Sequence, residues 1–111
     1  NAHEAEYFAD RGIEVVAMAG MEFGDAPDRG LKFAAVPPDQ ICDHVRSVDQ
    51  TDAEAIFISC ANFASASVVQ DLEEELGKPV ITSNISTFWA GLRTAGVDDP
   101  IGGYGSLLAT K

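Results

Sequence analysis

The fold is decided between residues 55 and 84, which read AIFISCANFASASVVQDLEEELGKPVITSN. A short apolar run at 55–58 is followed by an amphipathic stretch at 65–76 and a second apolar run at 80–82. Short continuous apolar runs are typical of strands buried on both faces of a parallel sheet, and the stretch between them has helical spacing. Gly77 is placed to end that helix. The segment therefore predicts a unit of strand, helix and parallel strand.

The same alternation continues on both sides of this segment. Upstream, the pattern predicts a helix over 2–11 ended by Gly12, a buried strand over 13–18, a loop over 20–36 and a helix opened by Pro37-Pro38-Asp39. Downstream, Ser83 or Asn84 is expected to cap a helix that carries an apolar stripe and ends near Gly96: Ile85, Phe88, Trp89 and Leu92.

This order of elements predicts one α/β domain over residues 1–111, a parallel sheet with helices on both faces. A domain of this kind normally opens on a strand, whereas this chain opens at Asn1 on a helical pattern without an initiator Met. We therefore expect the first strand to lie upstream, in a longer protein. The glycine-rich tail at about 101–111 is expected to cross to a neighbouring domain.

Composition excludes several partners. The 111 residues carry 7 Lys and Arg against 18 Asp and Glu, a net charge of −11 that disfavours nucleic acid and anionic membranes. No apolar run approaches the roughly 20 residues of a membrane span, and no signal peptide opens the chain. We predict a soluble, cytoplasmic protein. Its two cysteines are too few for a disulfide framework.

Cys60 is the strongest candidate for chemistry. Ligands of parallel sheets bind beyond the carboxyl ends of the strands, where we expect Ser59-Cys60-Ala61-Asn62 and Ser83-Asn84 to lie. The N-terminus of the next helix would lower the pKa of the Cys60 thiol, and the N–H groups of Ala61 and Asn62 would donate hydrogen bonds to a carboxylate. The alternative is a small apolar residue that ends a strand. Asn84 fits a helix cap better than a ligand contact.

Other chemistry-bearing residues have plainer interpretations. Cys42 belongs to the apolar stripe of its helix, and we expect His3 and His44 to be solvated. No Cys or His spacing fits a zinc site, so neither a metal nor an organic cofactor is expected. The acidic run at 73–75 reads as a solvated helix face, and the glycines of 102–105 match no nucleotide-binding loop.

Several motifs in order resemble one known family: AIFISCANF at 55–63, LEEELGKPVITSN at 72–84, WAGLR at 89–93 and GYGSLL at 103–108. The chain is similar to the C-terminal half of the aspartate/glutamate racemase superfamily, in its maleate cis-trans isomerase and arylmalonate decarboxylase branch. The resemblance covers nearly the whole chain. It implies a three-layer, flavodoxin-like unit that forms one half of a two-domain enzyme, with the active site between the halves.

The resemblance also implies a cofactor-independent isomerase or racemase that acts on a small dicarboxylic or amino acid. Cys60 would be its catalytic residue, with Ser59, Ala61, Asn62, Ser83 and Asn84 binding the substrate. Ala61 stands where decarboxylases have glycine, which favours the isomerase. The required partner would be the N-terminal half of the same enzyme, so the 111 residues alone are expected to be inactive.

Two other functions stay open at this point. An arylmalonate decarboxylase-like lyase would use Cys60 as a proton donor, and a catalytically silent α/β domain would only bind a small acid. The substrate itself stays open, because the groups that select it lie largely outside this half. Assembly into a homo-oligomer is also open.

Overall fold

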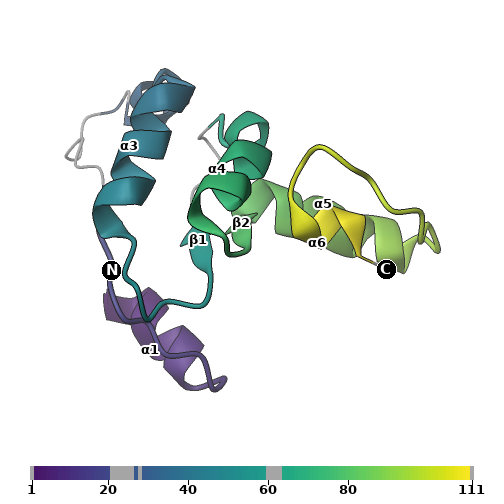
Figure 1. The fold of residues 1–111 in the computed structure, drawn as a ribbon, viewed down its shortest axis with the longest axis horizontal. Helices are drawn as coiled ribbons and strands as arrows, with labels where there is room; N and C mark the ends of the chain where they lie inside the picture. Colours follow the sequence, from purple (N-terminus) through teal and green to yellow (C-terminus); the bar gives the residue numbers. More distant parts are fainter. Residues whose placement is uncertain (1, 21–26, 28, 60–63, 111) are drawn as a thin grey trace.

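The computed structural model describes residues 2–20, 27, 29–59 and 64–110. Figure 1 shows two strands in the middle of the molecule, α1 at one end and the α5–α6 pair at the other. In chain order the elements are α1 (Ala2–Ala9), α2 (Arg29–Ala34), α3 (Pro38–Val48), β1 (Ile56–Ile58), a 3₁₀ turn (Ala66–Val68), α4 (Val69–Leu76), β2 (Val80–Thr82), α5 (Ser83–Thr94) and α6 (Ser106–Ala109).

β1 and β2 form a parallel pair, which confirms the α/β class. Ile56 is paired with Val80 and Ile58 with Thr82, so the two strands end at the same level. Ile56 and Ile58 are buried in one core with the apolar faces of α3 and α4. Phe57 points to the opposite face of the sheet, where the ring of Phe8 in α1 packs edge-on at 5.5 Å between centroids. Helices therefore contact both faces of this pair.

The helix between the two strands forms as the sequence predicts. The apolar residues at 68, 69 and 72 are buried, and Gly77 ends α4 in the left-handed conformation with φ +69°. A residue with a Cβ adopts this conformation only at a cost, which explains glycine at this position. α3 begins after Pro37, with Pro38 in its first turn, also as predicted.

The expected strand over 13–18 is wrong, because these residues form no strand. Ile13, Val16 and Met18 are between 42% and 54% exposed. A strand requires a neighbour that pairs with its N–H and C=O groups. The sheet built by the described residues contains β1 and β2 and does not include this stretch. Residues 13–18 are apolar as a strand would be, but no strand among the described residues pairs with them.

Two further expectations need correction. The predicted loop over 20–36 contains the short helix α2, whose Leu31, Lys32 and Ala34 favour helix despite Gly30. The cap of α5 is Thr82, whose Oγ1 accepts a hydrogen bond from the N–H of Ile85 at 3.0 Å, and not Ser83 or Asn84. Three capping side chains follow one another here, and the last paired residue of β2 decides which one is used.

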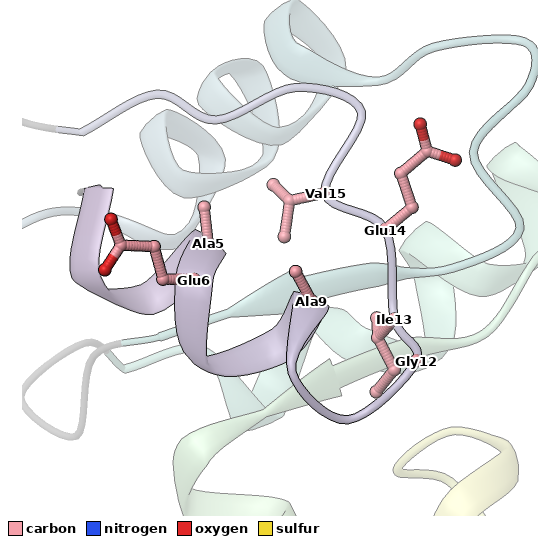
Figure 2. Close-up of a pocket in the computed structure, with 7 residues that line it drawn as sticks. All are labelled: Ala5, Glu6, Ala9, Gly12, Ile13, Glu14 and Val15. Atoms are coloured by element: carbon pink, nitrogen blue, oxygen red, sulfur yellow. The ribbon is translucent and has the colours of Figure 1, made fainter.

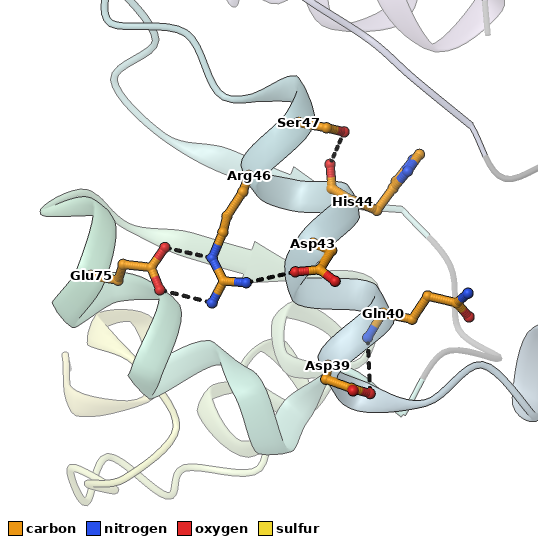
Figure 3. A network of polar contacts seen from close by, with 7 residues as sticks. All are labelled: Asp39, Gln40, Asp43, His44, Arg46, Ser47 and Glu75. Carbon is orange, nitrogen blue, oxygen red and sulfur yellow. Dashed lines mark hydrogen bonds and ion pairs between the residues drawn. The ribbon is translucent and has the colours of Figure 1, made fainter.

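The acidic run at 73–75 is structural and not merely a solvated face. Glu73 accepts hydrogen bonds from the N–H of Val80 at 2.9 Å and from the N–H of Ser106 at 2.8 Å. It therefore joins α4 to β2 and to the tail. Glu75 pairs with Arg46 of α3, as Figure 3 shows.

The C-terminal tail packs on its own chain. Leu108 is buried in the core, and the N–H of Gly105 donates to the side-chain oxygen of Gln70 at 3.0 Å. Arg93 of α5 donates to the carbonyl of Thr110. These contacts hold the tail against α4 and α5, whatever else it touches in a longer protein.

Candidate functional site

The parallel register brings two of the predicted site residues to one edge of the sheet. Ser59 follows β1 directly, and Ser83 follows β2 directly. The Oγ of Ser83 lies 3.5 Å from the carbonyl oxygen of Ile58, so it donates across the strand ends. Because both strands end at the same level, the carboxyl ends of β1 and β2 form one edge of the sheet, where a ligand is expected to bind.

Cys60, Ala61 and Asn62 lie outside the described residues. The residues on either side, up to 59 and from 64, are described, and the helical turn Ala66–Val68 follows soon after residue 64. Ser65, at the start of this turn, is fully buried, and its hydroxyl has no hydrogen-bond partner within the described part of the chain. Hydroxyl residues thus stand on both sides of the 60–63 segment in the chain: Ser59, which is exposed, and Ser65, which is buried.

Asn84 is exposed in the first turn of α5. Since Thr82 provides the cap, the structural role expected for Asn84 is wrong. Its place beside Ser83 at the strand edge remains compatible with a contact to a ligand.

Glu4 is a polar residue at this edge that sequence reasoning missed. The Oγ of Ser59 donates to its Oε1 at 2.6 Å, although the two residues are 55 positions apart. This hydrogen bond lowers the pKa of the Glu4 carboxyl below its ordinary value. An acidic residue in the first turn of a helix is common on dipole grounds alone, so no sequence signal distinguishes it.

A shallow hollow of about 410 Å³ opens beside this hydrogen bond. It runs from the first turns of α1 to the end of β1, and its lining residues are His3, Glu4, Tyr7, Phe8, Phe57 and Ser59. Aromatic walls with a few polar groups at one end are typical of sites for small molecules.

A second hollow, of about 460 Å³, lies between α1 and the segment that follows it. Figure 2 shows its lining, in which small apolar side chains face inward while Glu6 and Glu14 lie at the margin. It contains no predicted site residue. Two carboxylates at the margin would repel an acid, so this hollow does not suit a carboxylate ligand.

The other cysteine behaves as expected for a packing residue. Cys42 is half-buried against the core, and burial raises the pKa of its thiol. His3 is exposed, as expected. His44, by contrast, is half-buried, and its Nε2 is shielded from solvent without a partner among the described residues. The expectation of a fully solvated His44 is wrong.

The described ranges of the chain contain no group of three or more His, Cys, Asp or Glu side chains arranged to hold a metal ion. None of their helices combines the length and the apolarity of a membrane-spanning segment.

Comparison with known proteins gives consistent results. The model of the arylmalonate decarboxylase family matches residues 1–108. The chain is 26% identical to the maleate isomerase of Alcaligenes faecalis over 106 residues, which covers 95% of this chain and 40% of the relative. The chain therefore spans about two fifths of the length of this relative.

Two solved structures extend the comparison. A cysteine-to-alanine variant of the maleate isomerase from Pseudomonas putida S16, with maleate, matches with a TM-score of 0.83 at 30% identity. The match covers 96% of this chain and 41% of that one. A crystal structure of arylmalonate decarboxylase matches with a TM-score of 0.77 at 24% identity, covering 94% and 45%, which supports a shared fold.

Proposed function

Since the chain belongs to the arylmalonate decarboxylase family, we propose that its protein is a cofactor-independent isomerase of small dicarboxylic or amino acids, similar to maleate isomerase, with Cys60 as the catalytic residue. The observation that carries this proposal is the match to maleate isomerases over almost the whole chain.

We propose that residues 1–111 form the C-terminal half of this enzyme and that an N-terminal half completes the active site. Two observations support this division. The chain spans 40% of the Alcaligenes relative. Its 13–18 stretch also has the composition of a buried strand but no strand partner among the described residues. In a flavodoxin-like order, the second strand pairs only with the first, which would then lie between 13–18 and β1 and complete the three-layer fold.

The proposed chemistry places the thiolate of Cys60 next to the carbon that neighbours a substrate carboxylate. With maleate, the sulfur would bond to one alkene carbon while the C=C π pair moves onto the carboxylate next to the other alkene carbon; rotation about the resulting single bond and expulsion of the thiolate would re-form the C=C bond as in fumarate. With an amino acid, the thiolate would instead take the proton from that carbon and leave the electron pair on the carboxylate. The N–H groups of Ala61 and Asn62 would bind the oxygens on which negative charge develops. Ser83 and Asn84, at the end of β2, would contact the substrate from the neighbouring strand, and Ser59 lies at the same edge.

The deciding experiment measures conversion of maleate to fumarate by the full-length protein. Cys60→Ala is expected to lower turnover by about a thousandfold or more, because it removes the reacting group. The matched control is Cys42→Ala, which should keep full activity. Its free energy of unfolding should fall by about 1 kcal/mol, because a packed side chain is shortened. Full activity of Cys60→Ala would refute the assignment of the catalytic residue.

The family model gives one alternative a specific basis, since its description is arylmalonate decarboxylase. Release of CO₂ from an arylmalonate, without isomerisation of maleate, would favour the lyase, with Cys60 as proton donor. Equal and slow alkylation of Cys60 and Cys42 by iodoacetamide would instead favour a silent domain that binds a small acid. Inactivity of the isolated 111 residues, a cytoplasmic location and a homo-oligomer stay predictions or open questions.

A further inference from the structure

The inference concerns the side of α5 that faces away from the core. Ile85 and Trp89 pack this helix against the core. The opposite side carries residues spaced three or four positions apart, all of them exposed, which we call the outer face of α5: Asn84, Thr87, Phe88, Gly91 and Thr94. Phe88, in the middle of this face, is 54% exposed.

The outer face of α5 differs in charge from the exposed faces of neighbouring helices. α1, α3 and α4 each present acids to solvent, among them Glu6, Asp43 and Glu74, in a chain whose net charge is −11. The only charged residue of α5 is Arg93, and its guanidinium donates to two carbonyl groups of its own chain. An exposed aromatic ring within an uncharged surface is typical of the centre of a protein–protein interface.

Gly91 is an independent sign that another surface comes close. It lies inside α5, and a Cβ built on it would meet nothing within 4 Å in the described part of the chain. Its φ is not in the left-handed region either. Glycine destabilises a helix interior relative to alanine, so neither conformation nor internal packing explains it here. A partner that packs closely against the helix beside Phe88 does explain it.

The position of the outer face indicates what covers it. α5 begins at Ser83, at the edge of the sheet where we propose that the substrate binds, and leads away from the strands at the end opposite α1 (Figure 1). A first strand between 13–18 and β1 would pair with the edge of β1 that β2 leaves open, so it would not cover α5. A partner that closes the substrate edge would instead continue from Asn84 onto Phe88 and Gly91.

We propose that the N-terminal half of the same enzyme docks on the outer face of α5, with Phe88 at the centre of the contact and Gly91 permitting close approach. The proposal rests on the proposed function, because it assumes that this half exists; the chain spans only 40% of the Alcaligenes relative. The chain exposes 7078 Å², against about 5,900 Å² for a compact protein of 11.7 kDa. The difference exceeds the roughly 800 Å² that one partner contributes to a standard interface.

A second copy of the chain is the competing occupant. The outer face of α5 is short, since 12 residues of helix span about 18 Å. A separate molecule must offset its loss of translational and rotational freedom with a large contact. A partner in the same chain has already lost most of that freedom, so a smaller contact is sufficient. The limited length of the face therefore favours the N-terminal half.

The test measures how fast a cysteine on this face reacts in the full-length protein. Thr87→Cys places a thiol beside Phe88, and the matched control Glu74→Cys places one on the exposed face of α4. Alkylation by iodoacetamide is followed by mass spectrometry of each labelled peptide, in native and in urea-unfolded protein. The ratio of the unfolded to the native rate should be at least about tenfold larger for Thr87→Cys, because a covered thiol reacts only on opening.

Adding Phe88→Glu to Thr87→Cys separates the two occupants. If the N-terminal half covers the face, the buried charge should loosen the contact and raise the native alkylation rate about tenfold, with the mass measured by sedimentation unchanged. If a second copy covers it, the mass should fall from two chains to one, which would overturn the proposal. An unchanged rate and mass would also overturn it, because Phe88 would then lie outside the contact.

A further measurement uses the sign of a stability change. Leucine favours helix over glycine, so Gly91→Leu should raise the midpoint of thermal unfolding of the full-length protein if the outer face is bare. If the N-terminal half packs closely there, the larger side chain should lower the midpoint by about 4 °C or more. A raised midpoint, or a Thr87→Cys thiol that reacts as fast as the control, would refute the docking. Failure of the wild-type protein to isomerise maleate would refute the proposed function alone, since neither alkylation nor unfolding depends on turnover.

Discussion

Gly105 shows at the scale of one residue why the tail carries a Gly-Tyr-Gly motif. Its φ is +90°, and a Cβ built on it would lie 2.5 Å from Cγ1 of Val69 and 3.0 Å from Oε2 of Glu73. A side chain would therefore push the tail off the helix to which Glu73 and Gln70 bind it. The motif marks a close approach of backbone to α4.

Gly105→Ala is expected to lower the free energy of unfolding by about 2 kcal/mol or more, from backbone strain and steric overlap combined. The matched control is Gly102→Ala, where an added Cβ meets nothing within 4 Å, and its effect should stay within about 0.5 kcal/mol. Urea unfolding of both variants in the full-length protein gives the comparison. Equal costs at the two positions would contradict this account of the motif.

At the scale of elements, charged side chains connect neighbouring helices and strands around the core. Arg46 of α3 makes two hydrogen bonds to Glu75 of α4, at 2.6 and 2.8 Å, as Figure 3 shows. Lys78, which precedes β2, donates to Asp49 at the end of α3 at 2.8 Å. The Arg46–Glu75 pair is exposed, so its contribution to the free energy of unfolding depends on pH and salt. The Lys78–Asp49 pair is largely shielded from solvent.

The Arg46–Glu75 pair makes a prediction about pH. The hydrogen bonds from Arg46 lower the pKa of Glu75 in the folded protein, so the pair stabilises above the unfolded pKa and is lost as pH falls through the lowered folded value. Glu75→Gln should therefore reduce the loss of stability between neutral and acidic pH, measured by unfolding at each pH. Glu74→Gln serves as control, because Glu74 is an adjacent exposed acid whose carboxylate accepts a hydrogen bond from the amide of Gln70 at 3.1 Å. An identical pH dependence in wild type and Glu75→Gln would refute the prediction.

The whole molecule is more open than a self-contained domain of its mass. It exposes 7078 Å², whereas a compact monomer of 11.7 kDa exposes about 5,900 Å². Its radius of gyration is 14.5 Å, against about 13 Å for a compact domain of 111 residues. The apolar residues of 13–18 contribute to this excess, as does Phe88, which is 54% exposed although it belongs to the predicted stripe of α5.

At this scale we expect the stretch 13–18 to become a strand in the full-length protein. In the full-length protein every second amide of 13–18 should exchange slowly, because one neighbouring strand pairs alternate N–H groups and paired N–H groups exchange only on opening. In the isolated 111-residue chain the same amides should exchange quickly. Fast exchange in the full-length protein would show that the stretch finds no strand partner there and would contradict the proposed completion of the sheet.

The local structure of the central segment could be predicted from the sequence. Apolar runs at 55–58 and 80–82, the helical spacing at 65–76 and Gly77 each act over a few residues, and the structure confirms all four. The placement of Cys42 on a packed helix face was determined in the same way. The motifs were also sufficient to identify the family, because they extend over nearly the whole chain.

Which segments these elements contact depends on the tertiary structure. The strand expected at 13–18 depends on a neighbour, the cap of α5 on where β2 stops pairing, and the contacts of Glu4 and Glu73 on residues far along the chain. Periodicity reports which face of an element is apolar, but not which segment covers it. Pairing between distant residues is fixed by packing, so contacts such as the hydrogen bond from Ser59 to Glu4 are visible only in the folded chain.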